Sequence, residues 1–324
     1  MSQARETMRA MVIDHFGGVE ALRTEIIPVP QLEDHEILMR VQVAGVGTWD
    51  PFEREGGYAD AIPGHVKFPY VLGSEGSGVV ERIGNQVEGF AVGDSVYAVS
   101  FLNPKGGFYA EYAAVDAQLV SSVPAHLSIE QAGVLTGGGI TALRGLDDVL
   151  KLRAGETVLI FGANGGIGHM AVQLARQMGA RVFAVASGQD GAAFIKQLGV
   201  DRVVDGRSDD VLSALKSFAP DGLDAALLTA GGEAAERSLD GIRRGGRVAF
   251  PNGIFPVPNE RPGCQLLPYN GTPDGDIVRR YDEAVKAGRL TPHVAAIFPL
   301  EHAQEAHRRL DTHYIGRLAL RVTS

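Results

Sequence analysis

The spacing of apolar and polar positions changes near Pro124. Before it, short apolar runs such as 37–43 and 78–83 are separated by Gly, Asn and Asp, which is typical of antiparallel strands joined by turns. After it, apolar runs of strand length such as 157–161 and 181–185 alternate with segments of helix length. Strands that alternate with helices predict a parallel sheet covered on both faces.

The end of the chain returns to the first pattern, because residues 316–322 predict a strand like those before Pro124. A chain of 324 residues is also long for a single core. We therefore predict an α/β protein with two domains. An irregular antiparallel β-rich domain comprises residues 1–124 plus 271–324, and a doubly wound parallel domain comprises residues 125–270.

Composition excludes several classes of protein. With 45% hydrophobic and 21% charged residues, the chain is neither disordered nor collagenous. A net charge of -9 gives no basic surface for nucleic acid or an anionic membrane, and no apolar run approaches the ~18 residues that span a bilayer. Cys264 is the single cysteine, and residues 1–18 lack the apolar core of a signal peptide. We therefore expect a cytoplasmic protein with a small-molecule ligand.

A glycine-rich loop, Gly162 to Gly168, stands between a predicted strand and a predicted helix. A dinucleotide pyrophosphate needs a tight turn, a backbone without Cβ atoms and free N–H groups at a helix N-terminus. Gly165 and Gly168 occupy the second and third glycine positions of that pattern, and Ala163 stands at the first. The alternative is a turn that only packs the helix on the strand. The residues expected to bind the cofactor here are Ala163, Asn164, Gly165, Gly166, Ile167 and Gly168.

The end of the next strand bears on the choice between NAD and NADP. An NAD site places an acid there on the ribose 2′-hydroxyl, whereas this chain has Ser187 and Gly188 and no acid before Asp190. A small uncharged end leaves room for a 2′-phosphate, so we expect NADP(H). Arg207, beyond the third strand, is the nearest cation that we expect to bind the phosphate. A solvated loop arginine is the alternative interpretation of Arg207.

At this point the sequence resembles the medium-chain dehydrogenase/reductase superfamily, and within it the zinc-free quinone oxidoreductase-like branch. The resemblance implies a GroES-like catalytic domain and a Rossmann dinucleotide-binding domain. It extends over nearly the whole chain, in the expected order of motifs. The matching segments are 10–18, 71–80, 93–97, 107–112, 141–143, 155–160, the glycine loop and 316–320.

Two departures from the zinc-dependent relatives concern metal ligands. Those relatives place a Cys where this chain has Gly47, and a His where it has Ser74. A catalytic zinc would lack two of its three protein ligands, so we expect no metal. Quinone-reductase relatives usually carry an Asn at the position of Gly47, near the nicotinamide, and this chain lacks that side chain.

The resemblance also implies site residues. On the cofactor side it places Thr141 near the nicotinamide and Ser187 and Gly188 at the adenosine ribose. At the carboxyl edge of the sheet, where open parallel sheets hold ligands, it places Thr229, Ala230, Asn252 and Gly253. It further implies a homodimer formed through the sheet edge near Gln265.

The loop 47–52, with Arg54, should line the substrate side. The catalytic candidates are Trp49, Asp50, Phe52 and Tyr58, with Tyr58 as a candidate proton donor. Packing in the core or in a lid is the alternative role for Trp49 and Phe52. His302 and His307 stand five apart on a predicted helix, so they are expected to be solvated surface residues rather than a metal pair.

The sequence thus predicts a zinc-independent, NADPH-dependent oxidoreductase that transfers hydride to a quinone or to an activated, enone-type double bond. The cofactor would carry the chemistry, and the protein would orient and desolvate the reactants. A non-catalytic NADPH-binding or sensor protein is one alternative, because Gly47 replaces an Asn and no acid is obvious. A zinc-dependent alcohol dehydrogenase is the second.

Overall fold

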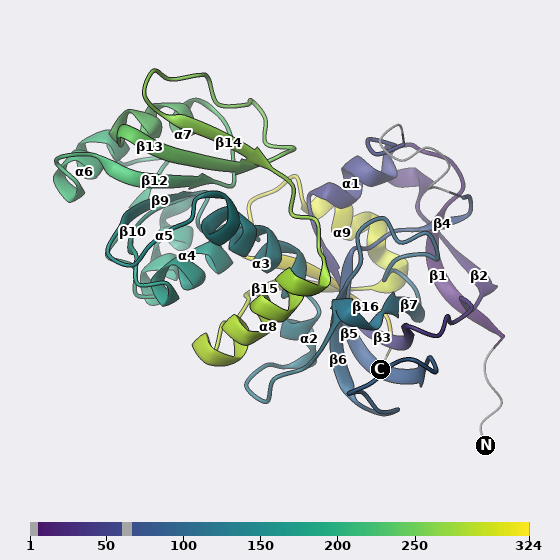
Figure 1. Cartoon of the computed structure of the whole chain (residues 1–324). Helices are drawn as coiled ribbons and strands as arrows, with labels where there is room; N and C mark the ends of the chain where they lie inside the picture. Colours follow the sequence, from purple (N-terminus) through teal and green to yellow (C-terminus); the bar gives the residue numbers. More distant parts are fainter. Residues whose placement is uncertain (1–5, 60–66, 324) are drawn as a thin grey trace. The chain divides into compact units, whose positions relative to one another are not determined.

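A computed structural model describes residues 6–59 and 67–323 of the chain. The chain divides into two compact units (Figure 1). The first unit comprises residues 1–137, 273–282 and 291–324, and the second comprises 138–272 and 283–290. The domain boundaries expected from the sequence, at 124/125 and 270/271, stay a prediction, since the compact units follow contacts and divide helix α8 (Gly275–Gly288) between them.

The first unit is built on a seven-stranded sheet in the order β15-β16-β3-β5-β6-β8, with β7 also paired to β3, and on a three-stranded sheet in the order β2-β1-β4. Apart from the parallel pair β15 and β16, its strands pair antiparallel. The strands are β1 (Thr7–Ile13), β2 (Arg23–Pro28), β3 (Glu36–Val46), β4 (Tyr70–Val71), β5 (Glu75–Ile83), β6 (Ser95–Val99), β7 (Tyr112–Asp116), β8 (Val120–Ser122), β15 (Val294–Pro299) and β16 (Arg317–Arg321). The helices beside them are α1 (Trp49–Arg54), α2 (Ile129–Ala132) and α9 (Ala303–Arg309).

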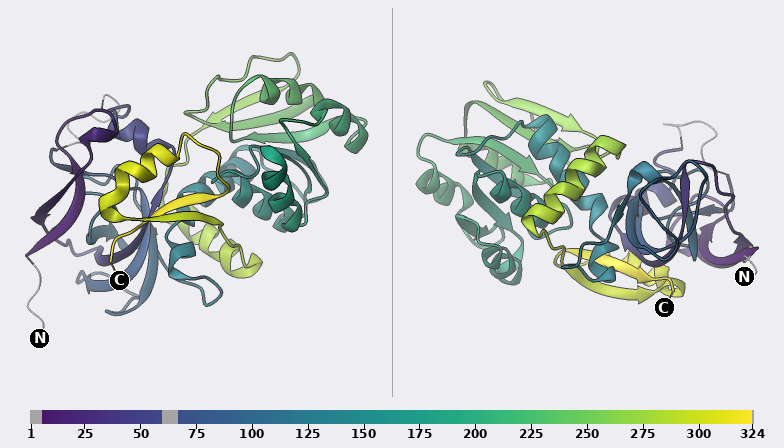
Figure 2. Two further views of the ribbon diagram at one scale, coloured as in Figure 1. Left: turned by 180° about the vertical axis from the view of Figure 1, so that it is seen from behind. Right: turned by 60° about the horizontal axis from the view of Figure 1, so that its bottom comes forward.

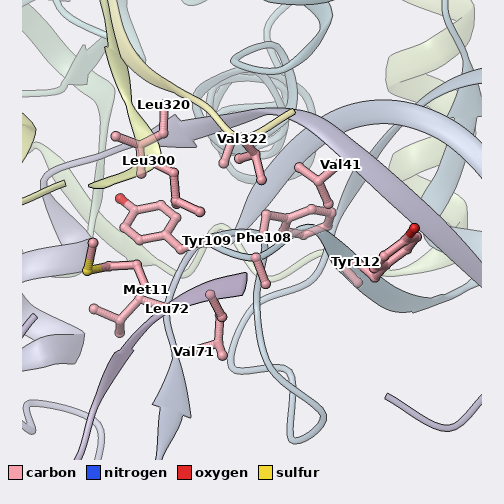
Figure 3. Close-up of a cluster of buried hydrophobic side chains, with 14 of the residues drawn as sticks. Met11, Val41, Val71, Leu72, Phe108, Tyr109, Tyr112, Leu300, Leu320 and Val322 are labelled. Carbon is pink, nitrogen blue, oxygen red and sulfur yellow. The ribbon is translucent and has the colours of Figure 1, made fainter. Parts of the chain in front are cut away.

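The C-terminal segment belongs to the first unit, as its sequence pattern predicts. Strand β16 pairs with both β3 and β15. Helix α9 packs on β15 and β16, the C-terminal strands drawn in yellow in Figure 2. Apolar side chains from the two ends of the chain therefore share one core. Figure 3 shows Met11 and Tyr109 beside Leu300 and Leu320 in that core.

The second unit is a six-stranded, wholly parallel sheet in the order β11-β10-β9-β12-β13-β14. Its strands are β9 (Thr157–Phe161), β10 (Arg181–Ala186), β11 (Arg202–Asp205), β12 (Leu223–Leu228), β13 (Ile242–Pro251) and β14 (Gln265–Tyr269). The helices are α3 (Thr136–Leu143), α4 (Gly168–Gln177), α5 (Gly188–Gln197), α6 (Val211–Phe218) and α7 (Glu233–Ser238). Helices α4 and α5 cover one face and α6 and α7 the other (Figure 1), which confirms the doubly wound α/β class.

The segment after Ser128 forms two short helices, α2 and α3, in place of one continuous helix. Ser128 does begin a helix, through a capping box with Gln131, but α2 ends at Ala132 and Gly133 is its C-cap. Helix α3 begins at Thr136 and passes into a π-helical turn over 144–149. Gly133 ends α2, whereas the glycines at 137–139 lie within α3 despite their low helix propensity.

Across the part of the chain that the structure describes, no helix combines the length and the apolar character needed to cross a membrane.

Candidate functional site

The glycine loop of the second unit joins β9 to α4. Gly162 has φ +76°, a conformation that L side chains rarely adopt, so Gly162 makes the tight turn that the sequence pattern assigned to Ala163. Ala163 is completely buried, and its N–H donates to the carbonyl of Val185 at 2.9 Å. The loop is thereby anchored to β10 before it reaches Gly165.

Two glycines of this loop serve different purposes. A Cβ at Gly168 would lie 2.1 Å from the carbonyl oxygen of Gly162, so a glycine is needed for α4 to pack against the strand end. A Cβ at Gly165 would meet only that same oxygen, at 3.4 Å, so this part of the loop is open. No side chain caps α4 at Ile167, and the first N–H groups of a helix have no partner within it. The loop and helix terminus therefore fit a dinucleotide pyrophosphate.

The predicted ribose end of the site is held by two side chains. The N–H of Ser187 donates to Oδ1 of Asn164 at 2.8 Å, so buried Asn164 ties the glycine loop to the end of β10. Gly188 has φ +84° and begins α5, and its N–H donates to Oδ1 of Asp205 at 2.8 Å. Asn164 thus has a structural role beside any contact with the cofactor.

Asp205 is a residue that the sequence interpretation missed. Its carboxylate accepts the N–H of Arg207 at 3.0 Å and the hydroxyl of Ser208 at 3.1 Å, and these hydrogen bonds, with that of Gly188, lower its pKa. Asp205 is therefore ionised at neutral pH beside Ser187 and Gly188. The available signal was its place at the end of the third strand, where an acid can face the same ligand edge.

The other predicted cofactor residues also lie in the second unit. Thr229 follows β12, and its hydroxyl donates to the carbonyl of Phe161 at 2.8 Å. Ala230 and Asn252 are exposed after β12 and β13, and Gly253 has φ +98°. Thr141 is buried, and its carbonyl accepts the hydroxyl of Tyr269 from the end of β14 at 2.9 Å. Thr229, Ala230, Asn252 and Gly253 thus follow the carboxyl ends of neighbouring strands.

On the predicted substrate side, α1 carries Trp49 and Phe52, and Tyr58 follows the helix. Phe52 is 48% exposed, and Tyr58 meets its ring edge to face at 4.9 Å between centroids. The indole of Trp49 is half-buried, and its N–H donates to Oγ of Ser74 at 3.2 Å. The guanidinium of Arg317 stacks on the same indole at 4.8 Å. Trp49 is therefore fixed in orientation while part of its ring stays accessible.

Asp50 and Arg54, expected to line the substrate side, are instead turned into the first unit. Asp50 has no exposed surface, and its Oδ2 accepts the N–H of Gly47 at 2.7 Å and the hydroxyl of Tyr109 at 3.0 Å. Burial raises the pKa of Asp50 to about 7. Arg54 is 5% exposed. Helix α1 is amphipathic: Phe52 faces outward, Trp49 is half-buried, and Asp50, Glu53 and Arg54 lie on the buried face.

His307 is not the solvated residue that its helical spacing from His302 suggested. His302 is exposed, but His307 lies on the inward face of α9 with Ala303 and Ala306 and is 3% exposed. Burial, with the nearby Arg54, lowers its pKa to about 3, so its imidazole is neutral. The expectation was wrong because α9 packs this face against the first unit, where the imidazole meets Arg54 and Tyr109.

The donor set does not fit a catalytic zinc. Gly47 has no side chain, and a Cβ there would lie 2.7 Å from the indole of Trp49 and 2.9 Å from a guanidinium nitrogen of Arg317. Oγ of Ser74 accepts the indole N–H. The neighbouring Glu75 pairs with Arg317 and accepts the N–H of Gly137 at 2.7 Å. Among the described residues, no three His, Cys, Asp or Glu side chains form a group that could hold a metal ion.

Two family models match the chain: an alcohol dehydrogenase GroES-like domain over residues 33–125 and a zinc-binding dehydrogenase domain over residues 166–267. The alcohol dehydrogenase of Geobacillus stearothermophilus is 32% identical and is aligned over 78% of this chain and 80% of its own length. The chain belongs to the medium-chain dehydrogenase/reductase superfamily. It is an oxidoreductase of the type whose Rossmann domain binds a nicotinamide cofactor.

Within this superfamily the chain is quinone oxidoreductase-like. The quinone oxidoreductase of Lama guanicoe is 29% identical, over 98% of this chain and 97% of its own. The NADPH-dependent alkenal/one oxidoreductase of Arabidopsis thaliana is 28% identical, over 97% and 79%. The structure of the quinone oxidoreductase from Coxiella burnetii has a TM-score of 0.82 at 26% identity and covers 98% of this chain and 100% of its own.

Proposed function

We propose that this medium-chain reductase transfers hydride from NADPH to a quinone or to an enone-type double bond without zinc. The observation that carries the proposal is a combination: the dinucleotide cradle at Gly162 to Gly168 is retained, while Gly47 and Ser74 stand where zinc-using relatives place ligands. The relatives named quinone oxidoreductase and NADPH-dependent alkenal/one oxidoreductase support the same substrate class.

When bound, the reduced nicotinamide supplies the hydride, and the chain supplies position and surroundings. Gly165, Gly168 and the start of α4 would hold the pyrophosphate. Trp49 and Phe52 would present apolar ring surface to a planar substrate. Tyr58 is the candidate donor for the proton that completes the reduction. The Tyr58 hydroxyl is protonated at neutral pH, and burial raises its pKa, which makes it a weaker acid than a free tyrosine.

The choice of NADPH over NADH rests on the end of β10. Ser187 brings no negative charge there, and the exposed Arg207 is two residues beyond β11. Asp205 favours NADH, because it brings a negative charge to this end of the site. Its carboxylate accepts the N–H groups of Gly188 and Arg207. The proposal follows Arg207, because it brings a positive charge to this end of the site, whereas the carboxylate of Asp205 is already occupied by the N–H groups of its own loop.

Two further parts of the proposal concern assembly and location. Strand β14 is the last strand of its sheet and its residues Gln265 to Pro268 are not fully buried, so it offers an edge for pairing with a second copy. We propose a homodimer formed through this edge. A cytoplasmic location fits the single cysteine, Cys264.

The test is NADPH oxidation by the purified protein with a series of quinones and enones, followed at 340 nm and repeated with NADH and with a chelator present. We expect turnover with NADPH that the chelator leaves unchanged. Tight NADPH binding without turnover on any of these substrates would instead support the sensor alternative, which the complete burial of Asp50 favours. Stoichiometric zinc in the active protein would revive the alcohol dehydrogenase alternative.

A further inference from the structure

A hydrogen-bonded chain of buried side chains crosses the first unit behind helix α1. Nη1 of Arg54 lies 3.0 Å from Nδ1 of His307, and Nε2 of His307 lies 3.2 Å from the hydroxyl oxygen of Tyr109. That hydroxyl donates to Oδ2 of Asp50 at 3.0 Å. At most 5% of each of these four residues is exposed. Residues from α1, from α9 and from the segment before β7 are thus joined without solvent.

In each hydrogen bond among these four side chains, only one assignment of donor and acceptor is possible. A guanidinium has donors and no acceptor, so Nδ1 of His307 must accept from Arg54. The neutral imidazole then carries its hydrogen on Nε2 and donates it to the hydroxyl oxygen of Tyr109. Tyr109 has its own hydrogen left for Asp50. The permanent charge of Arg54 therefore fixes the orientation of every group in the chain.

The series of hydrogen-bonded side chains ends at Asp50, in the turn that also contains Trp49. Oδ2 of Asp50 accepts the N–H of Gly47, while the N–H of Asp50 donates to the carbonyl of Gly47 at 3.1 Å. These reciprocal bonds close the turn from Gly47 to Asp50. Oδ1 of Asp50 is buried and has no hydrogen-bond partner among the described residues. Both hydrogen bonds to this carboxyl therefore act on one oxygen, and rotating it would leave both donors unpaired.

We propose that Arg54, His307 and Tyr109 are positioning residues that act through Asp50 to hold the turn and orient the indole of Trp49 for a planar substrate. The inference rests on the proposed function in one respect, that Trp49 belongs to the substrate side. The contacts of the indole with Ser74 and Arg317 orient the ring only if its backbone is held. The buried chain holds that backbone.

The first test compares Tyr109→Phe with Tyr97→Phe in the full chain. Tyr97 is a matched control, because its buried hydroxyl also donates to a carboxylate in the first unit, that of Asp282 at 2.9 Å. Trp49 is the only tryptophan of the chain, so acrylamide quenching of fluorescence excited at the red edge, where tyrosine does not absorb, reports on it alone. We expect Tyr109→Phe to increase quenching and to raise the KM for a quinone about fivefold with kcat nearly unchanged, as loss of one hydrogen bond implies. Tyr97→Phe should change neither.

A second pair of variants separates positioning from stability. In His307→Gln the amide oxygen can accept from Arg54 and the amide nitrogen can donate to Tyr109, so quenching and KM should stay near the wild-type values. His307→Leu removes both bonds and should change both values.

The proposal is overturned if Tyr109→Phe and His307→Leu lower the melting temperature but leave quenching and KM unchanged. If the wild-type protein reduces no quinone or enone, the proposed function fails. The quenching comparison still decides whether the buried hydrogen-bonded side chains hold Trp49 in place.

Discussion

The cofactor site predicted in the second unit and the substrate side predicted in the first unit differ in what they are made of. In the second unit, the cofactor side is made of backbone: a loop with glycines at fixed intervals, a helix N-terminus and strand ends carrying Thr229 and Gly253. In the first unit, the substrate side rests on buried charged side chains, including Asp50, Arg54 and Arg317. A site made of backbone requires that side chains be absent where the ligand approaches. A site made of side chains requires partners from distant parts of the sequence.

This difference predicts unequal tolerance to substitution, and the largest effect should come from the glycine loop. In Gly165→Ala, the new methyl group meets only the carbonyl oxygen of Gly162, at 3.4 Å, so the protein should fold normally. The methyl group would stand where the pyrophosphate must approach, and we expect NADPH affinity to fall at least about tenfold. Isothermal titration calorimetry measures the loss.

Gly168→Ala and Gly17→Ala are the comparison variants for that measurement. A Cβ at Gly168 would lie 2.1 Å from a backbone oxygen, so this variant should lose stability on the order of 1–3 kcal/mol as well as affinity. A Cβ at Gly17 makes only ordinary contacts at 3.6 Å, so affinity and stability should both remain. Unchanged NADPH binding in Gly165→Ala would show that the loop is only a packing turn.

The first unit should respond to pH instead. Asp50 has a pKa of about 7 in the folded protein, because it is buried, against 3.8 for an ordinary Asp. The folded state therefore binds the proton more tightly than the unfolded state. This contribution to stability is complete below about pH 4 and is lost as the pH rises through 7, a change on the order of 4 kcal/mol over that range.

Asp50→Asn should flatten that dependence, because the amide stays neutral. Urea unfolding of both proteins at pH 5 and pH 8 measures it, with a smaller loss between the two pH values in the variant. Burial also raises the pKa of Glu53 to about 7, so Glu53 makes stability fall with pH in the same direction. The variant Glu53→Gln removes that contribution. Equal slopes in wild type and Asp50→Asn would mean that Asp50 is already ionised at pH 5.

The same contrast explains how much could be predicted from the sequence. The alternation of strands and helices gave the parallel sheet, and the residues of its glycine loop are adjacent in the chain, so their arrangement follows from local order. The hydrogen bonds that join Arg54, His307 and Tyr109 connect distant parts of the sequence, and Tyr109 and His307 are 198 positions apart, so no local pattern indicates them. His307 looked like a surface residue because its partners are visible only after α9 packs.

The smallest predicted effect concerns Arg207, whose contribution would be one charge at an exposed position. If Arg207 binds the 2′-phosphate, Arg207→Ala should lower kcat/KM for NADPH roughly five- to tenfold, the range of one charge-assisted hydrogen bond at a partly solvated site, and leave NADH unchanged. Because the N–H of Arg207 still reaches Asp205, the loop should keep its shape in the variant. Equal losses with both cofactors would mean that Arg207 supports the loop, and a wild-type preference for NADH would assign the ribose end to Asp205.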